Sequence, residues 1–170
     1  MCENVLIHAF VTSKLDYCNS LLCKLPNSLI SRLQKLQNIA ARMVTRSRKL
    51  DHISPILTRI HWLPIPLRIK YKILLITFKC INGHGPSYLS ELIEKYVPQR
   101  TLRSSCNYLL KERKFKLKSY GERAFIISAP KLWNALPLDI RCEEKLSTFK
   151  SRLKTHLFQS FSQNPSVFIF

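Results

Sequence analysis

The sequence predicts an all-α protein, a multi-helix bundle of about seven helices, and three observations support this fold class. Only three of the 170 residues are glycine, which disfavours a Gly-rich nucleotide loop and a turn-rich β-sandwich. Several segments repeat apolar residues at steps of three and four, as helices do. Prolines and short polar clusters separate these segments where helices would begin and end. A chain of this length can form one domain with a substantial core.

Residues 61–83 form the predicted central helix. Pro64 and Pro66 fix φ at its start, and Asn82-Gly83 supplies a left-handed residue at its end. Apolar residues cover most of its circumference, so we expect neighbours to bury it on several sides. β-Branched residues are enriched, which makes a strand the competing interpretation, but about sixteen residues exceed an ordinary strand. We expect Trp62 and Phe78 to lie in the core.

Two helices are predicted before this one. The first covers residues 3–25 and ends at Pro26. Its expected buried residues are Val5, Leu6, Ala9, Phe10, Leu15, Tyr17, Leu21 and Leu22. The second covers residues 29–46, and its expected buried residues are Leu29, Leu33, Leu36, Ala40, Met43 and Val44.

The opposite side of the second helix carries a basic stripe, formed by Arg32, Lys35, Arg42, Arg46 and Lys49. No acidic residue occurs between Lys24 and Lys49. Like charges on one helix repel, and a bound phosphate backbone would relieve that cost. Gln34, Gln37 and Asn38 would add neutral donors for sugar and phosphate oxygens. The stripe therefore predicts nucleic-acid binding, with an ordinary solvated face as the alternative.

The second half of the chain is predicted to continue the bundle. Helices are expected at residues 53–60, 87–96, 121–129 and 146–161, with a helical turn restarted by Pro130 that places Trp133 in the core. Residues 114–118 alternate, so a short β-hairpin near residues 107–118 is expected. Basic and aromatic residues are interleaved there, which also suits single-stranded nucleic acid; an edge hairpin kept soluble by lysines is the alternative.

Charge and cysteine content narrow the functional class. A net charge of +18 favours a polyanionic partner, and nucleic acid and an anionic membrane surface both qualify. The six cysteines are dispersed without a Cys-x-x-Cys pair, so we expect them to be reduced and mostly buried in an intracellular protein. Cys80 and His84 have a loose metal-like spacing but no second ligand pair, so no metal site is predicted.

The sequence lacks the motifs of common enzyme classes. It contains no Gly-x-Ser-x-Gly elbow, His-Glu-x-x-His pair or Walker loop. Two-metal phosphoryl transfer needs convergent carboxylates, and the ten acidic residues are too dispersed to provide them. We therefore predict no catalytic residues, no cofactor and no small-molecule substrate.

Six short motifs together resemble a known family. They are residues 15–19 (LDYCN), 36–42 (LQNIAAR), 61–64 (HWLP), 85–89 (GPSYL), 120–125 (YGERAF) and 129–137 (APKLWNALP). In this order they are similar to the C-terminal part of reverse transcriptases from non-LTR (LINE-type) retrotransposons of the Jockey superfamily. The resemblance spans residues 6–158. The family's catalytic aspartate pair has no counterpart here, because the sequence contains no Asp-Asp.

The resemblance implies a thumb-like helical region at residues 1–98, a basic C-terminal extension at 99–161 and a frayed tail at 162–170. Such a region would grip a template–primer duplex, so the implied partners are an RNA or DNA duplex and the missing polymerase palm. We expect no membrane partner and an intracellular, nuclear location. The alternative is an inert or protein-interacting helical scaffold from a truncated element copy, with no nucleic-acid role.

Overall fold

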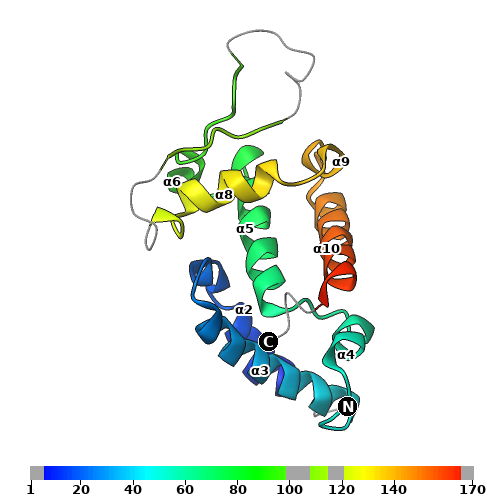
Figure 1. Ribbon diagram of the computed structural model, residues 1–170. Helices are drawn as coiled ribbons and strands as arrows, with labels where there is room; N and C mark the ends of the chain where they lie inside the picture. Colours follow the sequence, from blue (N-terminus) through cyan, green and yellow to red (C-terminus); the bar gives the residue numbers. More distant parts are fainter. Residues whose placement is uncertain (1–5, 99–107, 115–120, 166–170) are drawn as a thin grey trace. The chain divides into compact units, whose positions relative to one another are not determined.

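The computed structural model describes residues 6–98, 108–114 and 121–165, and these are all-α. They contain eight α-helices, together with one turn each of π-helix and 3₁₀-helix, and no strand (Figure 1). The elements are η1 (His8–Thr12), α2 (Ser13–Asp16), η2 (Asn19–Leu22), α3 (Asn27–Thr45), α4 (Ile53–Arg59), α5 (Ile65–Ile81), α6 (Ser87–Ser90), α8 (Phe125–Asn134), α9 (Leu138–Arg141) and α10 (Leu146–Gln163). The predicted multi-helix bundle is confirmed.

The chain divides into two compact units. Unit 1 comprises residues 1–69 and 156–170, and unit 2 comprises residues 70–155. The boundary expected between residues 98 and 99 does not coincide with this division. Helices α5 and α10 each begin in one unit and end in the other.

The ends of α5 have the predicted chemistry. At its C-terminal end Gly83 has φ +73°, and the His84 amide donates to the Lys79 carbonyl at 2.8 Å, as in a Schellman motif. Gly85 follows where no side chain fits, since a Cβ there would lie 2.7 Å from Cys80 Sγ. Two glycines thus turn the chain sharply after α5.

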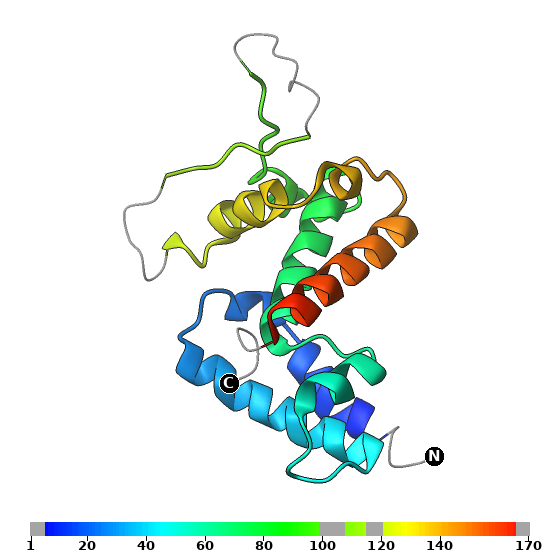
Figure 2. The ribbon, with the colours of Figure 1, turned by 45° about the vertical axis from the view of Figure 1, so that its right-hand side comes forward.

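Aromatic packing forms the core of unit 2. The rings of Phe78 on α5 and Phe149 on α10 stack with centroids 4.2 Å apart, and Trp133 on α8 stacks on Phe149 at 5.9 Å. All three are almost fully buried, so the predictions for Phe78 and Trp133 are confirmed. Figure 2 shows α10 alongside α5, with α8 crossing near the C-terminal end of α5. α8 continues through Pro130, where two separate segments were expected.

The predicted first helix is wrong in two respects. The chain leaves the helical conformation at Tyr17, which is extended, and at Cys18, which has φ 49°. Leu6, Phe10, Tyr17 and Leu21 were expected to be buried and are exposed, whereas Ile7 is buried. Segments of four and five residues thus replace one long helix.

The region after α5 also differs from expectation. Helix α6 ends at Ser90, and the chain then becomes extended, where a helix to residue 96 was expected. Lys95 forms an antiparallel bridge with Leu110. This bridge pairs Leu110 with a residue outside the expected hairpin, and the described part of that hairpin, residues 108–114, contains no strand. Residues 107 and 115–118 lie outside the described residues.

No helix in the described part of the chain has the length and apolar character needed to cross a membrane.

Candidate nucleic-acid interface

Helix α3 buries its amide side chains and exposes much of its apolar side. Gln34, Gln37 and Asn38 are buried, and the exposed fractions of Gln34 and Gln37 are 0%. Leu29, Leu36 and Met43 were expected to be buried but are exposed, with 60% of Met43 accessible. The predicted role of the three amides as donors to sugar and phosphate is therefore wrong, because these groups point into the protein.

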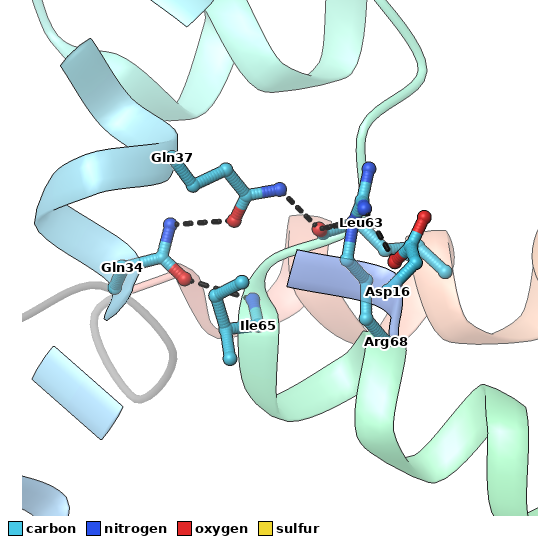
Figure 3. Close-up of polar contacts among 6 residues, drawn as sticks. All are labelled: Asp16, Gln34, Gln37, Leu63, Ile65 and Arg68. Carbon is cyan, nitrogen blue, oxygen red and sulfur yellow. Dashed lines mark hydrogen bonds and ion pairs between the residues drawn. The ribbon is translucent and has the colours of Figure 1, made fainter. Parts of the chain in front are cut away.

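The buried amides bind the backbone at the start of α5 (Figure 3). Gln34 Oε1 accepts a hydrogen bond from the Ile65 amide at 2.8 Å, and Gln37 Nε2 donates to the Leu63 carbonyl at 2.8 Å. Gln34 Nε2 also donates to Gln37 Oε1 at 3.1 Å and to Asn38 Oδ1 at 2.8 Å. The pair fixes α3 against the first turn of α5.

This arrangement leaves no free N–H at the start of α5. The Ile65 amide is bound by Gln34, and Pro66 has no N–H. The amides of Leu67 and Arg68 both donate to the Pro64 carbonyl. An open helix N-terminus would attract an anion, but these groups are already satisfied. The start of α5 is therefore a structural junction and not a phosphate site.

Arg68 completes the junction. Its Nε donates to the Leu63 carbonyl at 3.1 Å, and its Nη1 pairs with Asp16 Oδ1 at 2.7 Å (Figure 3). The guanidinium also lies over the Trp62 ring, 5.8 Å from its centroid. Asp16, in the first of the short motifs, thus neutralises an arginine inside the unit.

The outward side of α3 presents two neighbouring rows. Residues 32, 36, 39 and 43 follow at steps of four, three and four, which places Arg32 at the head of an apolar row of Leu36, Ile39 and Met43. Lys35, Arg42 and Arg46 follow at steps of seven and four and form the adjacent basic row. The basic stripe therefore lies beside exposed apolar side chains.

The five stripe residues differ in their surroundings. Arg32 and Lys35 are exposed on the helix itself. Arg42 is partly buried, and its Nη2 donates to the Asp51 carbonyl at 3.1 Å. Arg46 is exposed at the C-terminal cap with φ 53°, and Lys49 is exposed in the turn beyond. The Asp51 carboxylate accepts from the Arg48 amide at 2.8 Å, so it is engaged in the turn.

An apolar groove adjoins the exposed row. It has a volume of about 310 Å³ and lies between η1–α2 and α3 within unit 1. Phe10, Leu15, Leu36 and Met43 are among its lining residues, and Lys14 is the one charged residue on that lining. Sequence reasoning missed this groove because it assigned both apolar faces to the core.

The basic segment near residue 111 is partly neutralised in unit 2. Lys111 Nζ pairs with Glu94 Oε2 at 2.8 Å, and Arg113 pairs with Glu94 Oε1. Hydrogen bonds from Lys111 and then Arg113 lower the pKa of the Glu94 carboxyl. Two cations expected to face a ligand thus serve to fix the chain.

The cysteines and acidic residues form no evident metal site. In the described ranges no three side chains of His, Cys, Asp or Glu come together as ligands. Cys23 and Cys80 are buried, and burial raises the pKa of the Cys80 thiol. Cys18 and Cys142 are exposed, so burial of most cysteines is not supported; Cys2 and Cys106 lie outside the described residues.

Comparison of the chain with protein-family models, curated proteins and solved structures finds no match in any of the three. The functional argument therefore depends on the residues of the chain itself.

Proposed function

We propose that this chain is a non-catalytic nucleic-acid-binding module, and that α3 contacts the phosphate backbone of a duplex through the basic stripe. The single observation that carries the proposal is the exposure of Arg32 and Lys35 on a helix without an acidic residue. Mixed-sign pairs, which would stabilise a merely solvated helix, are missing from this surface.

The overall charge supports the same proposal. At +18 the chain would attract any polyanion, and phosphate contacts give affinity with little dependence on sequence. The resemblance to non-LTR retrotransposon reverse transcriptases supplies the particular partner, a template–primer duplex in the nucleus. In that proposal the chain is a thumb-like part and the polymerase chemistry belongs to a palm encoded elsewhere.

The test is duplex binding as a function of salt concentration. Five phosphate contacts predict a slope of log K against log salt of about −4 to −5. The Arg32→Gln/Lys35→Gln double variant keeps helix propensity and removes two charges, so affinity should fall equally for different sequences and the slope should flatten by about two.

The matched control is Lys150→Gln/Lys154→Gln on α10, which removes two charges from another long helix. A non-specific polycation would respond equally to both double variants. Equal losses would contradict the assignment to α3, and absence of duplex binding by the parent chain would contradict the proposed function itself.

A second candidate function is protein binding through the exposed apolar row of α3. Leu36, Ile39 and Met43 border the apolar groove, and Lys14 and Lys35 lie beside it. Apolar surface flanked by cations complements an amphipathic helix with acidic flanks. This is the observation that favours the scaffold alternative over an inert chain.

The two candidates respond to different substitutions. Leu36→Ser/Met43→Ser removes apolar surface without changing charge. It should leave duplex binding unaltered if the stripe is the interface. It should abolish binding of a helical probe peptide with leucines at i, i+4, i+7 and glutamates on both flanks if the apolar row is the interface. A chain that binds neither duplex nor probe would be inert.

A further inference from the structure

Unit 2 contains a cavity that the proposed duplex surface does not use. It has a volume of about 500 Å³, within the usual range of small-ligand pockets. The end of α5, two extended segments, α8 and the turn after α9 enclose it. Its lining includes Lys95, Tyr96, Tyr108, Trp133 and Arg141.

The two extended segments are fixed to each other. The Tyr96 amide donates to the Leu109 carbonyl at 2.9 Å, and the Lys111 amide donates to the Glu94 carbonyl at 2.9 Å. These bonds flank the bridge between Lys95 and Leu110. The pocket wall is therefore a paired structure rather than a lone loop.

Helix α8 holds the same wall from the other side. Trp133 Nε1 donates to the Tyr108 carbonyl at 2.8 Å. Tyr108 has φ 49°, a conformation that a residue with a large side chain rarely adopts without support. The buried indole of Trp133 provides that support, so the position of Tyr108 beside the pocket is built into the fold.

The tyrosines contrast with the buried aromatic residues of the same unit. Tyr96 is 53% exposed and Tyr108 is 61% exposed, although both line the cavity. The ring pairs found in the described part of unit 2 join Phe78, Phe149 and Trp133, and neither tyrosine takes part. Two aromatic side chains at the mouth of a pocket can therefore accept a planar ligand.

The charges around the pocket indicate where a phosphate could lie. Lys95 and Arg141 are the cations of the lining. Glu143 is paired with Arg152 at 2.6 Å, and the Glu144 carboxylate is exposed. A carboxylate beside the cavity disfavours a phosphate inside it, whereas a neutral base avoids that repulsion and leaves its phosphates at the rim near the exposed Lys95.

We propose that this pocket accepts one unpaired nucleobase of a single-stranded nucleic acid, with Tyr96 and Tyr108 as stacking surfaces and Lys95 beside the backbone. The inference rests on the proposed nucleic-acid role, but it assigns a second site to unit 2. Stacking of a base on an aromatic ring contributes about 1–3 kcal/mol, so the base should strengthen binding by about 5- to 100-fold.

The test compares a thymidine decamer with an abasic decamer of equal length, using fluorescence anisotropy and the full chain. Both probes have the same phosphates, so the ratio of their affinities isolates the base. The parent should prefer the thymidine decamer by about 5- to 100-fold. Tyr96→Leu/Tyr108→Leu should remove this preference, and Tyr96→Phe/Tyr108→Phe should retain it.

Tyr88→Leu is the matched control, since Tyr88 is 66% exposed on α6 and does not line the cavity. It should leave the ratio unchanged. Equal binding of both decamers by the parent, or equal losses in the Tyr88 and pocket variants, would overturn the inference. If the leucine double variant fails to fold, loss of the preference in either single variant, Tyr96→Leu or Tyr108→Leu, still supports the inference, and its retention in both overturns it.

Duplex binding measured on the same samples separates the two proposals. Duplex binding with base-independent single-strand binding would contradict the pocket alone. A base-dependent preference without duplex binding would contradict the α3 surface alone. Loss of all binding in the parent would contradict both.

Discussion

Helices α3 and α10 have similar lengths and similar basic character, yet they bury opposite kinds of side chain. In α10 the row of Phe149, Leu153, Leu157 and Phe161 is buried, with exposed fractions of 5% or less. In α3 the buried row includes Gln34 and Gln37, and the row of Leu36, Ile39 and Met43 is exposed. Apolar periodicity therefore identifies both helices but identifies the buried face of only one.

The difference has a physical cause in the partner of each helix. α10 packs against aromatic rings, which favour apolar neighbours. The buried face of α3 meets the beginning of α5, where a backbone N–H and a carbonyl need partners. An apolar face would leave these groups unsatisfied, so amides occupy it. The chemistry of the neighbour decides which face is buried.

The largest effect is expected from Phe149→Ala. Phe149 stacks on both Phe78 and Trp133, so the variant should lose about 3–5 kcal/mol of the free energy of unfolding. Phe78→Ala should cost about the same. Urea denaturation followed by circular dichroism measures both. A midpoint close to that of the parent would show that the aromatic stack does not form the core.

A matched pair of leucines compares the two helices directly. Leu153 on α10 is fully buried and Leu36 on α3 is 54% exposed. Leu153→Ala should cost about 2–5 kcal/mol, whereas Leu36→Ala should stay within about 0.5 kcal/mol of the parent. Similar losses in both variants would mean that the apolar row of α3 is buried after all.

Gln34→Leu tests the amide face. The substitution leaves the Ile65 amide without its acceptor, and a buried unsatisfied N–H costs about 1–3 kcal/mol. Gln37→Leu should cost less, because the Leu63 carbonyl still accepts from Arg68 Nε. Urea midpoints of the two variants give the comparison. A neutral Gln34→Leu would place this residue back on the solvent face, as the sequence predicted.

The smallest effect is expected at Glu94 in unit 2. Its pKa is lowered in the folded state, so its contribution to stability is present above about pH 4.5 and is lost as pH falls through the folded pKa. Glu94→Gln should therefore melt slightly below the parent at pH 7, and the difference should vanish in acid. A difference that grows as the pH falls would contradict the pairing with Lys111 and Arg113.

The sequence predicted the fold class, the central helix and the core positions of Trp62, Phe78 and Trp133, because long apolar runs and Pro or Gly boundaries act locally. It did not predict the break at Tyr17 and Cys18, where no proline or glycine marks the change. It also assigned Gln34 and Gln37 to a ligand, since their true partners lie about thirty residues away in the chain. The candidate stripe was found by charge alone, and the pocket of unit 2 needed contacts between distant segments.

The amide of Asn134 has a consequence for self-association. Its Oδ1 accepts from the Leu110 amide and its Nδ2 donates to the Leu110 carbonyl, both at 2.9 Å. A neighbouring β-strand would form this same pair of bonds. Leu110 is bridged to Lys95 on one side and to this side chain on the other, so another polypeptide cannot add at that edge. A single side chain thus protects an almost strandless region from edge-to-edge aggregation.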